Sequence, residues 1–183
     1  NAPLPMESDR IVGWDEARKT VTDAYAGFDP RMAEIAEPFF TKGWIDAAVK
    51  PGKAPGAFAH PTVTEVHPYV MLNYLGKPRD VMTLAHELGH GVHDVLASDN
   101  HLLDYRPVLP LAETASTFAE MLVFDSLMAS LETPRERLAL VCGKVEDTFA
   151  TVFRQVAMFR FEQEAHQARR ELGELTTEAF SAL

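Results

Sequence analysis

The sequence has little cysteine, few basic residues and no long apolar run, and each shortage argues against a class of protein. Its single cysteine, Cys142, cannot form an internal disulfide bond, and one unpaired cysteine suits a reducing compartment. With 17 Lys and Arg against 27 Asp and Glu, the formal net charge is −10. This charge argues against binding to nucleic acid or to an anionic membrane, because binding phosphates requires clustered positive charge.

No apolar run approaches the roughly 18 residues expected of a membrane-spanning helix, and the first ten residues lack the charged-then-apolar pattern of a signal peptide. We therefore expect a cytoplasmic protein. A length of 183 residues suits one domain with a sizeable core, so residues 1–183 are predicted to form a single domain. The oligomeric state cannot be inferred from the composition.

Apolar residues at helical spacing predict that most of the chain is helical. Besides the helix considered next, helical segments are predicted at Trp14 to Ala26, Pro30 to Phe40, Leu111 to Leu131 and Pro134 to Gly173. Between about residues 43 and 75, short apolar runs separated by Gly and Pro favour strands and loops, and the best strand is His67 to Tyr74. The fold class predicted is mainly α (α+β), with a small antiparallel sheet.

The segment from Arg79 to Ser98, RDVMTLAHELGHGVHDVLAS, predicts an amphipathic helix that carries a metal-binding motif. His86, Glu87 and His90 form the pattern H-E-x-x-H. A helix holds the two imidazoles about one turn apart, so that both can bind one zinc ion while Glu87 reaches the water on the metal. The alternative is that both histidines are ordinary helix residues, one exposed and one in the core.

A catalytic zinc ion takes three protein ligands, so a third must come from elsewhere. A third histidine six residues after the second is excluded, because Leu96 stands there. His93 lies on the same face of the helix, but three residues after His90 on a straight helix its side chain would point away from a metal bound by His86 and His90. It therefore fits better as a residue that contacts a ligand or faces the substrate. Glu113, on the next predicted helix, is the best candidate. The competitors lie too near the second histidine or in a loop: Asp94, Asp99 and Asp104.

Glu113 and Glu120 share one face of the predicted helix by their spacing. Glu113 can therefore bind the metal while Glu120 accepts a hydrogen bond from a ligand imidazole. The alternative for Glu113 is a solvated helix glutamate, but the small and apolar residues around it (LAETAST) favour the metal.

HELGHGVH followed by AETASTFAE resembles the oligoendopeptidase F and thimet oligopeptidase family of zinc metallopeptidases. Further stretches match its oligoendopeptidase F branch: NAPLP at the start, WIDA at 44–47, PGKAPGAF at 51–58 and PYVMLNYLGKPRDVMTLAHELGH at 68–90. The resemblance implies a zincin-like helical catalytic core, with the small sheet beside the H-E-x-x-H helix and a channel that admits short peptides. It assigns His86, His90 and Glu113 as ligands of one Zn²⁺ per chain and Glu87 as the general base.

The resemblance also implies how a substrate is held. The strand from Pro68 to Tyr74 would pair with the substrate backbone as an added β-strand. Gly52 and Gly56 would permit a mobile loop over the cleft.

Two features of the family find no match in this sequence. Family members carry a C-terminal segment whose His and Tyr residues stabilise the oxyanion, and a helical region before the catalytic domain. We therefore expect a catalytic domain truncated at both ends. The function expected is a zinc-dependent metalloendopeptidase that hydrolyses short oligopeptides, with a zinc-activated water and Glu87 as general base. The alternative is a non-catalytic zinc-binding domain, either an inactive fragment or a scaffold.

Overall fold

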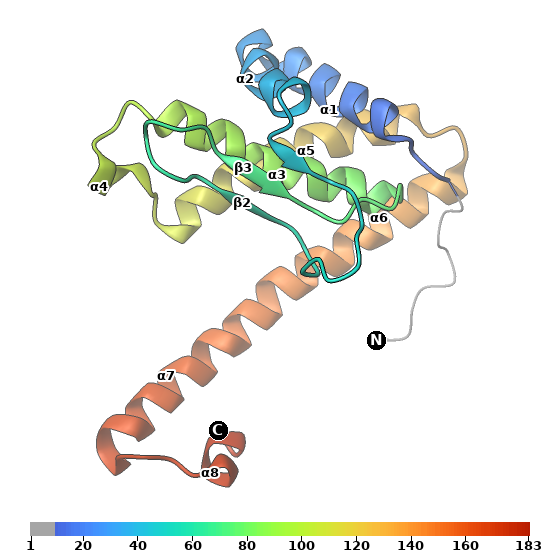
Figure 1. The fold of residues 1–183 in the computed structure, drawn as a ribbon. Helices are drawn as coiled ribbons and strands as arrows, with labels where there is room; N and C mark the ends of the chain where they lie inside the picture. Colours follow the sequence, from blue (N-terminus) through green and yellow to red (C-terminus); the bar gives the residue numbers. More distant parts are fainter. Residues whose placement is uncertain (1–9) are drawn as a thin grey trace. The chain divides into compact units, whose positions relative to one another are not determined.

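The computed structural model describes residues 10–183, so the NAPLP stretch lies outside the described residues. The helices are α1 (Trp14–Phe28), α2 (Pro30–Thr41), α3 (Pro78–Ala97), α4 (Leu102–Tyr105), α5 (Leu109–Ser130), α6 (Pro134–Phe149), α7 (Gln155–Leu172) and α8 (Thr177–Ser181), with one π-helical turn, η1 (Ala150–Arg154). The strands are β1 (Ile45–Asp46), β2 (Phe58–His60) and β3 (Tyr69–Met71). The prediction of a mainly helical chain with a small sheet is confirmed (Figure 1).

Two helix starts follow directly from local sequence chemistry. The Asp29 side chain accepts a hydrogen bond of 2.8 Å from the backbone N–H of Arg31, and Pro30 occupies the first position of α2, where its missing N–H costs nothing. Before α6, Thr133 and Glu136 exchange side chain–backbone hydrogen bonds of 3.2 and 3.3 Å, which is the capping-box arrangement. These contacts explain why the starts of α2 and α6 could be predicted from the sequence.

The sheet is mixed, and the expectation of an antiparallel sheet is corrected on this point. Its strand order is β1-β3-β2, with β1 parallel to β3 and β2 antiparallel to β3. β2 runs opposite to β1, and β3 runs opposite to β2. β3 lies between the two earlier strands. It must therefore run parallel to one neighbour and antiparallel to the other.

The helix α3 is the centre of the unit that ends at Glu136, and it contacts both β2 and β3 as well as α1, α2 and α5 (Figure 1). Five residues of its predicted apolar stripe are buried: Val81, Leu84, Ala85, Leu88 and Val92. The stripe was expected to continue to Val95 and Leu96, but Val95 is half-buried and Leu96 is exposed near the end of the helix. Tyr25 of α1 is fully buried, and its hydroxyl donates a hydrogen bond of 2.8 Å to the backbone oxygen of Ala85. Burial raises the pKa of this hydroxyl well above its usual value, so it remains a donor. The core thus fixes α3 on several sides.

The second compact unit begins at Arg137 and contains most of α6, together with η1, α7 and α8. Gly173, with φ of 81°, ends α7, and the rings of Phe161 and Phe180 then meet edge to face at 5.0 Å. The single-domain organisation expected for residues 1–183 stays a prediction. Across residues 10–183, no helix is long and apolar enough to cross a membrane.

Candidate metal centre

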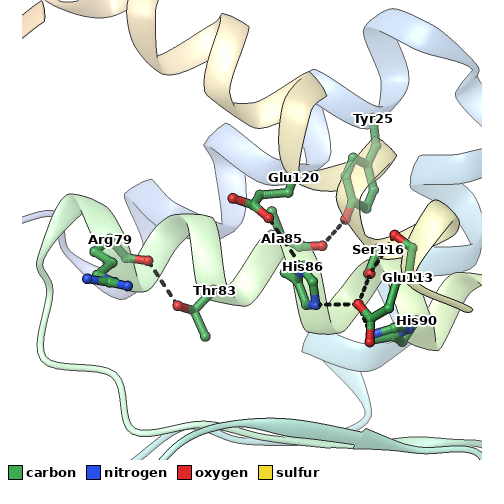
Figure 2. A network of polar contacts seen from close by, with 9 residues as sticks. All are labelled: Tyr25, Arg79, Thr83, Ala85, His86, His90, Glu113, Ser116 and Glu120. Carbon is green, nitrogen blue, oxygen red and sulfur yellow. Dashed lines mark hydrogen bonds and ion pairs between the residues drawn. The ribbon is translucent and has the colours of Figure 1, made fainter. Parts of the chain in front are cut away.

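The two histidines of the H-E-x-x-H motif lie one turn apart on α3. The ring centroids of His86 and His90 are 5.1 Å apart, and their side chains are 28% and 18% exposed. Both rings are therefore partly shielded by the fold while one side of each remains accessible. Figure 2 shows them pointing towards α5, with the carboxylate of Glu113 beside both.

Glu113 of α5 meets both imidazoles through one oxygen. Its Oε2 lies 3.3 Å from Nε2 of His86 and 3.6 Å from Nε2 of His90. Among residues 10–183, these three form the group of His, Cys, Asp and Glu side chains whose ligand atoms all lie within 4.8 Å of one another. The candidates that the structure leaves outside this group are His93, Asp94, Asp99 and Asp104. The predicted ligand set therefore comes together in space.

A close crossing of α3 over α5 produces this geometry. A Cβ placed on Gly89 would lie 2.6 Å from Cβ of Ala119 and 3.0 Å from Cα of Ser116, so only glycine fits at this point. Small residues on both helices let the backbones approach, which brings side chains of α5 within reach of α3. Ala115 and Ser116 of LAETAST thus lie against Gly89 of the HELGH sequence.

Glu120 holds the far side of the His86 ring. Its Oε2 lies 3.2 Å from Nδ1 of His86, and in Figure 2 Glu120 and Glu113 lie on opposite sides of that ring. Burial alone would lower the pKa of His86, but the hydrogen bond to Glu120 and the nearby carboxylates outweigh it and raise this pKa. A proton on Nδ1 that is shared with Glu120 leaves the lone pair of Nε2 free for a metal.

His90 has the opposite electrostatic balance. Burial lowers the pKa of its imidazole, and the neighbouring His86 and His93 lower it further against the opposing charge of Glu113. A lowered pKa favours the neutral imidazole, which is the form that binds metal ions.

Glu87 lies close to both the ligand cluster and β2. It is 9% exposed, and its carboxylate accepts a hydrogen bond from the backbone N–H of Ala59. Burial is the main reason that the pKa of Glu87 is raised, and the charge of Glu113 adds to it. A raised pKa brings a carboxylate closer to the range in which it can both accept and return a proton near neutral pH.

The loop between β1 and β2 is anchored at several points. The ammonium group of Lys53, 9% exposed, donates hydrogen bonds of 2.8, 3.0 and 2.7 Å to the backbone oxygens of Asp46, Ala48 and Leu72. The amide of Asn73 donates to the oxygens of Ala54 and Gly56 at 2.9 and 3.1 Å. The loop expected to be mobile is therefore tied to the ends of β1 and β3.

Sequence reasoning did not identify Ser116, Lys53 or the backbone of Ala59 as parts of this region. Ser116 follows Glu113 by one helical turn, so its spacing could have drawn attention to it. Neither Lys53 nor Ala59 carries a comparable signal, because their contacts depend on how the sheet pairs.

Comparison with known proteins places this geometry in a family. The family model described as peptidase family M3 matches residues 23–183, which include every residue of the ligand cluster. The chain belongs to peptidase family M3. Members of this family are metallopeptidases, which agrees with a His-His-Glu cluster on two helices.

Two bacterial peptidases are similar to this chain over nearly all of its length. The chromosomal oligoendopeptidase F of Lactococcus lactis subsp. cremoris is 30% identical over 177 residues, which are 96% of this chain and 29% of the relative. Oligopeptidase PepF of Bacillus subtilis (strain 168) is 29% identical over 177 residues, covering 96% of this chain and 26% of the relative. The chain thus spans less than a third of the length of these relatives.

The fold is shared with a solved structure of lower identity. PZ peptidase A superposes with a TM-score of 0.75 at 18% identity, over 93% of this chain and 30% of that chain. The arrangement of α3, α5 and the small sheet is therefore a fold with known examples.

Proposed function

We propose that this chain is the metal-binding core of a zinc-dependent endopeptidase that hydrolyses short oligopeptides. His86, His90 and Glu113 would hold one Zn²⁺, and Glu87 would act as general base. The observation that carries the proposal is the approach of Glu113 Oε2 to the two Nε2 atoms, at 3.3 and 3.6 Å. A tetrahedral zinc ion with bonds of about 2.0–2.2 Å places neighbouring ligand atoms about 3.3–3.6 Å apart. Two histidines and one glutamate are also a known donor set of zinc peptidases.

The chemistry divides between the metal and the protein. When bound, zinc supplies Lewis-acid polarisation of the substrate carbonyl and a lowered pKa for water. The carboxylate of Glu87 takes a proton from the attacking water and later returns it to the leaving amine. The burial of Glu87 and its hydrogen bond from Ala59 hold the group in one orientation beside the cluster.

The substrate strand proposed from the resemblance has to be changed. β3 lies between β1 and β2, so both of its edges are already paired, and the stretch Pro68 to Tyr74 cannot take an added strand there. β2 is an outer strand of the sheet. We propose that a substrate backbone lies along β2, where main-chain hydrogen bonds give affinity without requiring a particular side chain.

The register of β2 supports this choice. Ala59 lies opposite Val70, and the N–H of Val70 donates to the oxygen of Trp44, away from β2. Val70 and Ala59 are therefore a pair of opposite residues that do not hydrogen-bond to each other. In such an antiparallel pair the N–H and C=O groups of both residues point away from one another, so those of Ala59 point to the outer edge of the sheet. The N–H of Ala59 reaches Glu87 from this outer edge. A strand added there would lie beside the proposed general base.

The single cysteine supports a reducing compartment, and we propose a cytoplasmic location on that basis. The proposed partners are short peptides, since the net charge of −10 does not favour nucleic acid.

The proposal is tested by zinc content and peptide cleavage measured on the same preparations. We expect about one zinc per chain, cleavage of a quenched fluorescent oligopeptide, and a rate about 10²–10⁴-fold lower in Glu87→Gln, which keeps its zinc. His86→Ala should lose both zinc and cleavage.

Two outcomes would contradict the proposal in different ways. A chain that takes up no zinc from a zinc-containing buffer would exclude the metal site. A chain that binds zinc but cleaves no peptide, or that cleaves equally well as Glu87→Gln, would instead favour the non-catalytic zinc-binding alternative.

A further inference from the structure

Glu113 is the most exposed member of the ligand cluster. Its side chain is 45% exposed, compared with 28% for His86 and 18% for His90. A buried glutamate loses up to about 2 kcal/mol of rotamer freedom, and an exposed one keeps most of that freedom until something restrains it. The carboxylate therefore needs a restraining contact if it is to face the two histidines before a metal arrives.

The hydroxyl of Ser116 makes that contact. Oγ of Ser116 lies 2.9 Å from Oε2 of Glu113 and 3.1 Å from the backbone oxygen of Glu113 (Figure 2). A serine hydroxyl has one proton and can donate to only one acceptor at a time. The carboxylate is both the nearer acceptor and the charged one, and bonds to charged acceptors are roughly twice as strong as neutral ones.

The oxygen that Ser116 contacts is the one that matters for the metal. Oε2 of Glu113 is also the atom nearest to Nε2 of His86 and of His90. A hydrogen bond to this atom limits rotation of the carboxylate and holds Oε2 on the side of α5 that faces α3.

Packing keeps water away from the Ser116 hydroxyl. Ser116 is 0% exposed, and a Cβ on Gly89 would come within 3.0 Å of its Cα. A buried hydroxyl must find its hydrogen-bond partner within the protein. Because α3 covers Ser116, the hydrogen bond to Glu113 does not compete with solvent at the serine end.

We propose that Ser116 is a positioning residue that orients the carboxylate of Glu113 for metal binding. It acts only through Glu113 and touches neither metal nor substrate. The inference rests on the proposed function, since it requires that Glu113 bind the metal. Removing a contact that orients a metal ligand typically costs about 10–100-fold in metal affinity.

The test compares Ser116→Ala with Thr114→Ala. Thr114 is an exposed neighbour on the same helix whose hydroxyl donates to the backbone oxygen of Pro110 at 2.7 Å, so Thr114→Ala also removes one helix hydroxyl, together with a methyl group. Zinc affinity is measured by competition with a chromogenic chelator. We expect affinity to fall about 10–100-fold in Ser116→Ala and to stay at the wild-type value in Thr114→Ala.

Two further readouts separate positioning from a merely structural role. The metal-free chain of Ser116→Ala should remain folded, because the carboxylate of Glu113, 45% exposed, can bind water once the serine hydroxyl is gone, and alanine favours a helix more than serine does. With Co²⁺ in place of zinc, the visible absorption bands of Ser116→Ala should differ from wild type, since the coordination by Glu113 changes. The bands of Thr114→Ala should match wild type.

Failure of the Ser116 role can be distinguished from failure of the proposed function. A wild-type chain that binds no zinc overturns the proposed metal site itself. If wild type binds zinc and Ser116→Ala binds it equally well with the same Co²⁺ spectrum, the role of Ser116 is wrong while the metal site stands. A loss of affinity matched by unfolding of the metal-free chain also overturns the positioning role.

Discussion

Gly89 of α3 and Ala119 of α5 touch with no room for a side chain between them. A Cβ on Gly89 would lie 2.6 Å from Cβ of Ala119, well inside any normal contact between two carbon atoms. This crossing point lies between His86 and His90 in sequence, and it carries Glu113 and Glu120 of α5 to the two imidazoles. The geometry of the candidate metal centre therefore depends on the absence of one methyl group.

Gly89→Ala should destabilise the fold although alanine is the better helix former. The added methyl forces α3 and α5 apart, at a cost of about 1–3 kcal/mol, against a gain in helix propensity of about 1 kcal/mol. We expect a lower free energy of unfolding in urea, measured with a chelator present, and weaker zinc binding in a separate titration.

Gly143→Ala is the matched control, because nothing lies within 4 Å of a Cβ at that helical position. This variant should gain up to about 1 kcal/mol of stability. Equal stability of the two variants would show that the close crossing is not tight in solution.

The sequence was most informative where contacts are local. The spacing of His86, Glu87 and His90 fixes their relative positions on a helix, and the chemistry of Asp29-Pro30 fixes where α2 begins. Glu113 could be chosen by its spacing, its small neighbours and a resemblance, but the 2.6 Å approach behind its placement could not. Helix crossings depend on packing between residues far apart in the chain.

The sheet shows the limit more clearly. The stretch His67 to Tyr74 was predicted as a strand and forms one at Tyr69–Met71, but its central place in the sheet depends on pairing with β1 and β2, which no local pattern encodes. The strand expected to pair with substrate therefore has no free edge at Tyr69–Met71. Side chains that fasten the sheet, such as Lys53, were missed for the same reason.

Glu120→Ala should change both the proton affinity and the metal affinity of His86. The hydrogen bond from Nδ1 to Glu120 is the main cause that raises the pKa of His86, so this pKa should fall when the carboxylate is removed. Imidazole titration by NMR in the zinc-free chain measures this shift. Zinc affinity should fall about 10–100-fold because the ring loses its orienting partner.

Glu120→Gln serves as the conservative variant, because its amide oxygen can still accept from Nδ1. Its zinc affinity should lie between those of wild type and Glu120→Ala. An unchanged pKa of His86 in Glu120→Ala would contradict the role assigned to the hydrogen bond.

Lys53→Met should loosen the loop that leads into β2. The variant keeps the apolar stem but leaves three backbone oxygens without the ammonium group. The bonds to Asp46 and Ala48 are exposed, so water can replace them, and the main loss is the part-buried bond to Leu72, since one hydrogen bond to a charged donor contributes about 1.5–3 kcal/mol. We expect a loss of about 2–3 kcal/mol in the free energy of unfolding and faster amide exchange across residues 46–59. The pKa of Asp46, which the hydrogen bond from Lys53 lowers, should rise towards its usual value.

Lys50→Met is the control for charge alone. Lys50 lies 3.6 Å from Asp46 but its side chain is 64% exposed, and exposed ion pairs contribute at most about 1 kcal/mol. Comparable exchange rates in the two variants would contradict an anchoring role for Lys53.

Asp94 gives the fold a pH dependence that can be measured without metal. Its side chain is 7% exposed, and burial raises the pKa of its carboxyl to about 6, partly offset by Arg106. The unfolded chain has a pKa of about 3.9 at this residue. The folded state thus holds the proton more tightly, so Asp94 reduces stability progressively as the pH rises from about 4 through 6, and the cost is complete near pH 7.

Asp94→Asn should remove that cost. Two pK units correspond to about 3 kcal/mol in total, and about half of this falls between pH 5 and pH 8. The free energy of unfolding of Asp94→Asn minus that of wild type, measured in urea with a chelator, should therefore increase by about 1.4 kcal/mol over that range. Asp99→Asn, an exposed change nearby, serves as the control for replacing an aspartate by asparagine. A difference that stays constant or shrinks as the pH rises would mean that Asp94 is solvated in the folded chain.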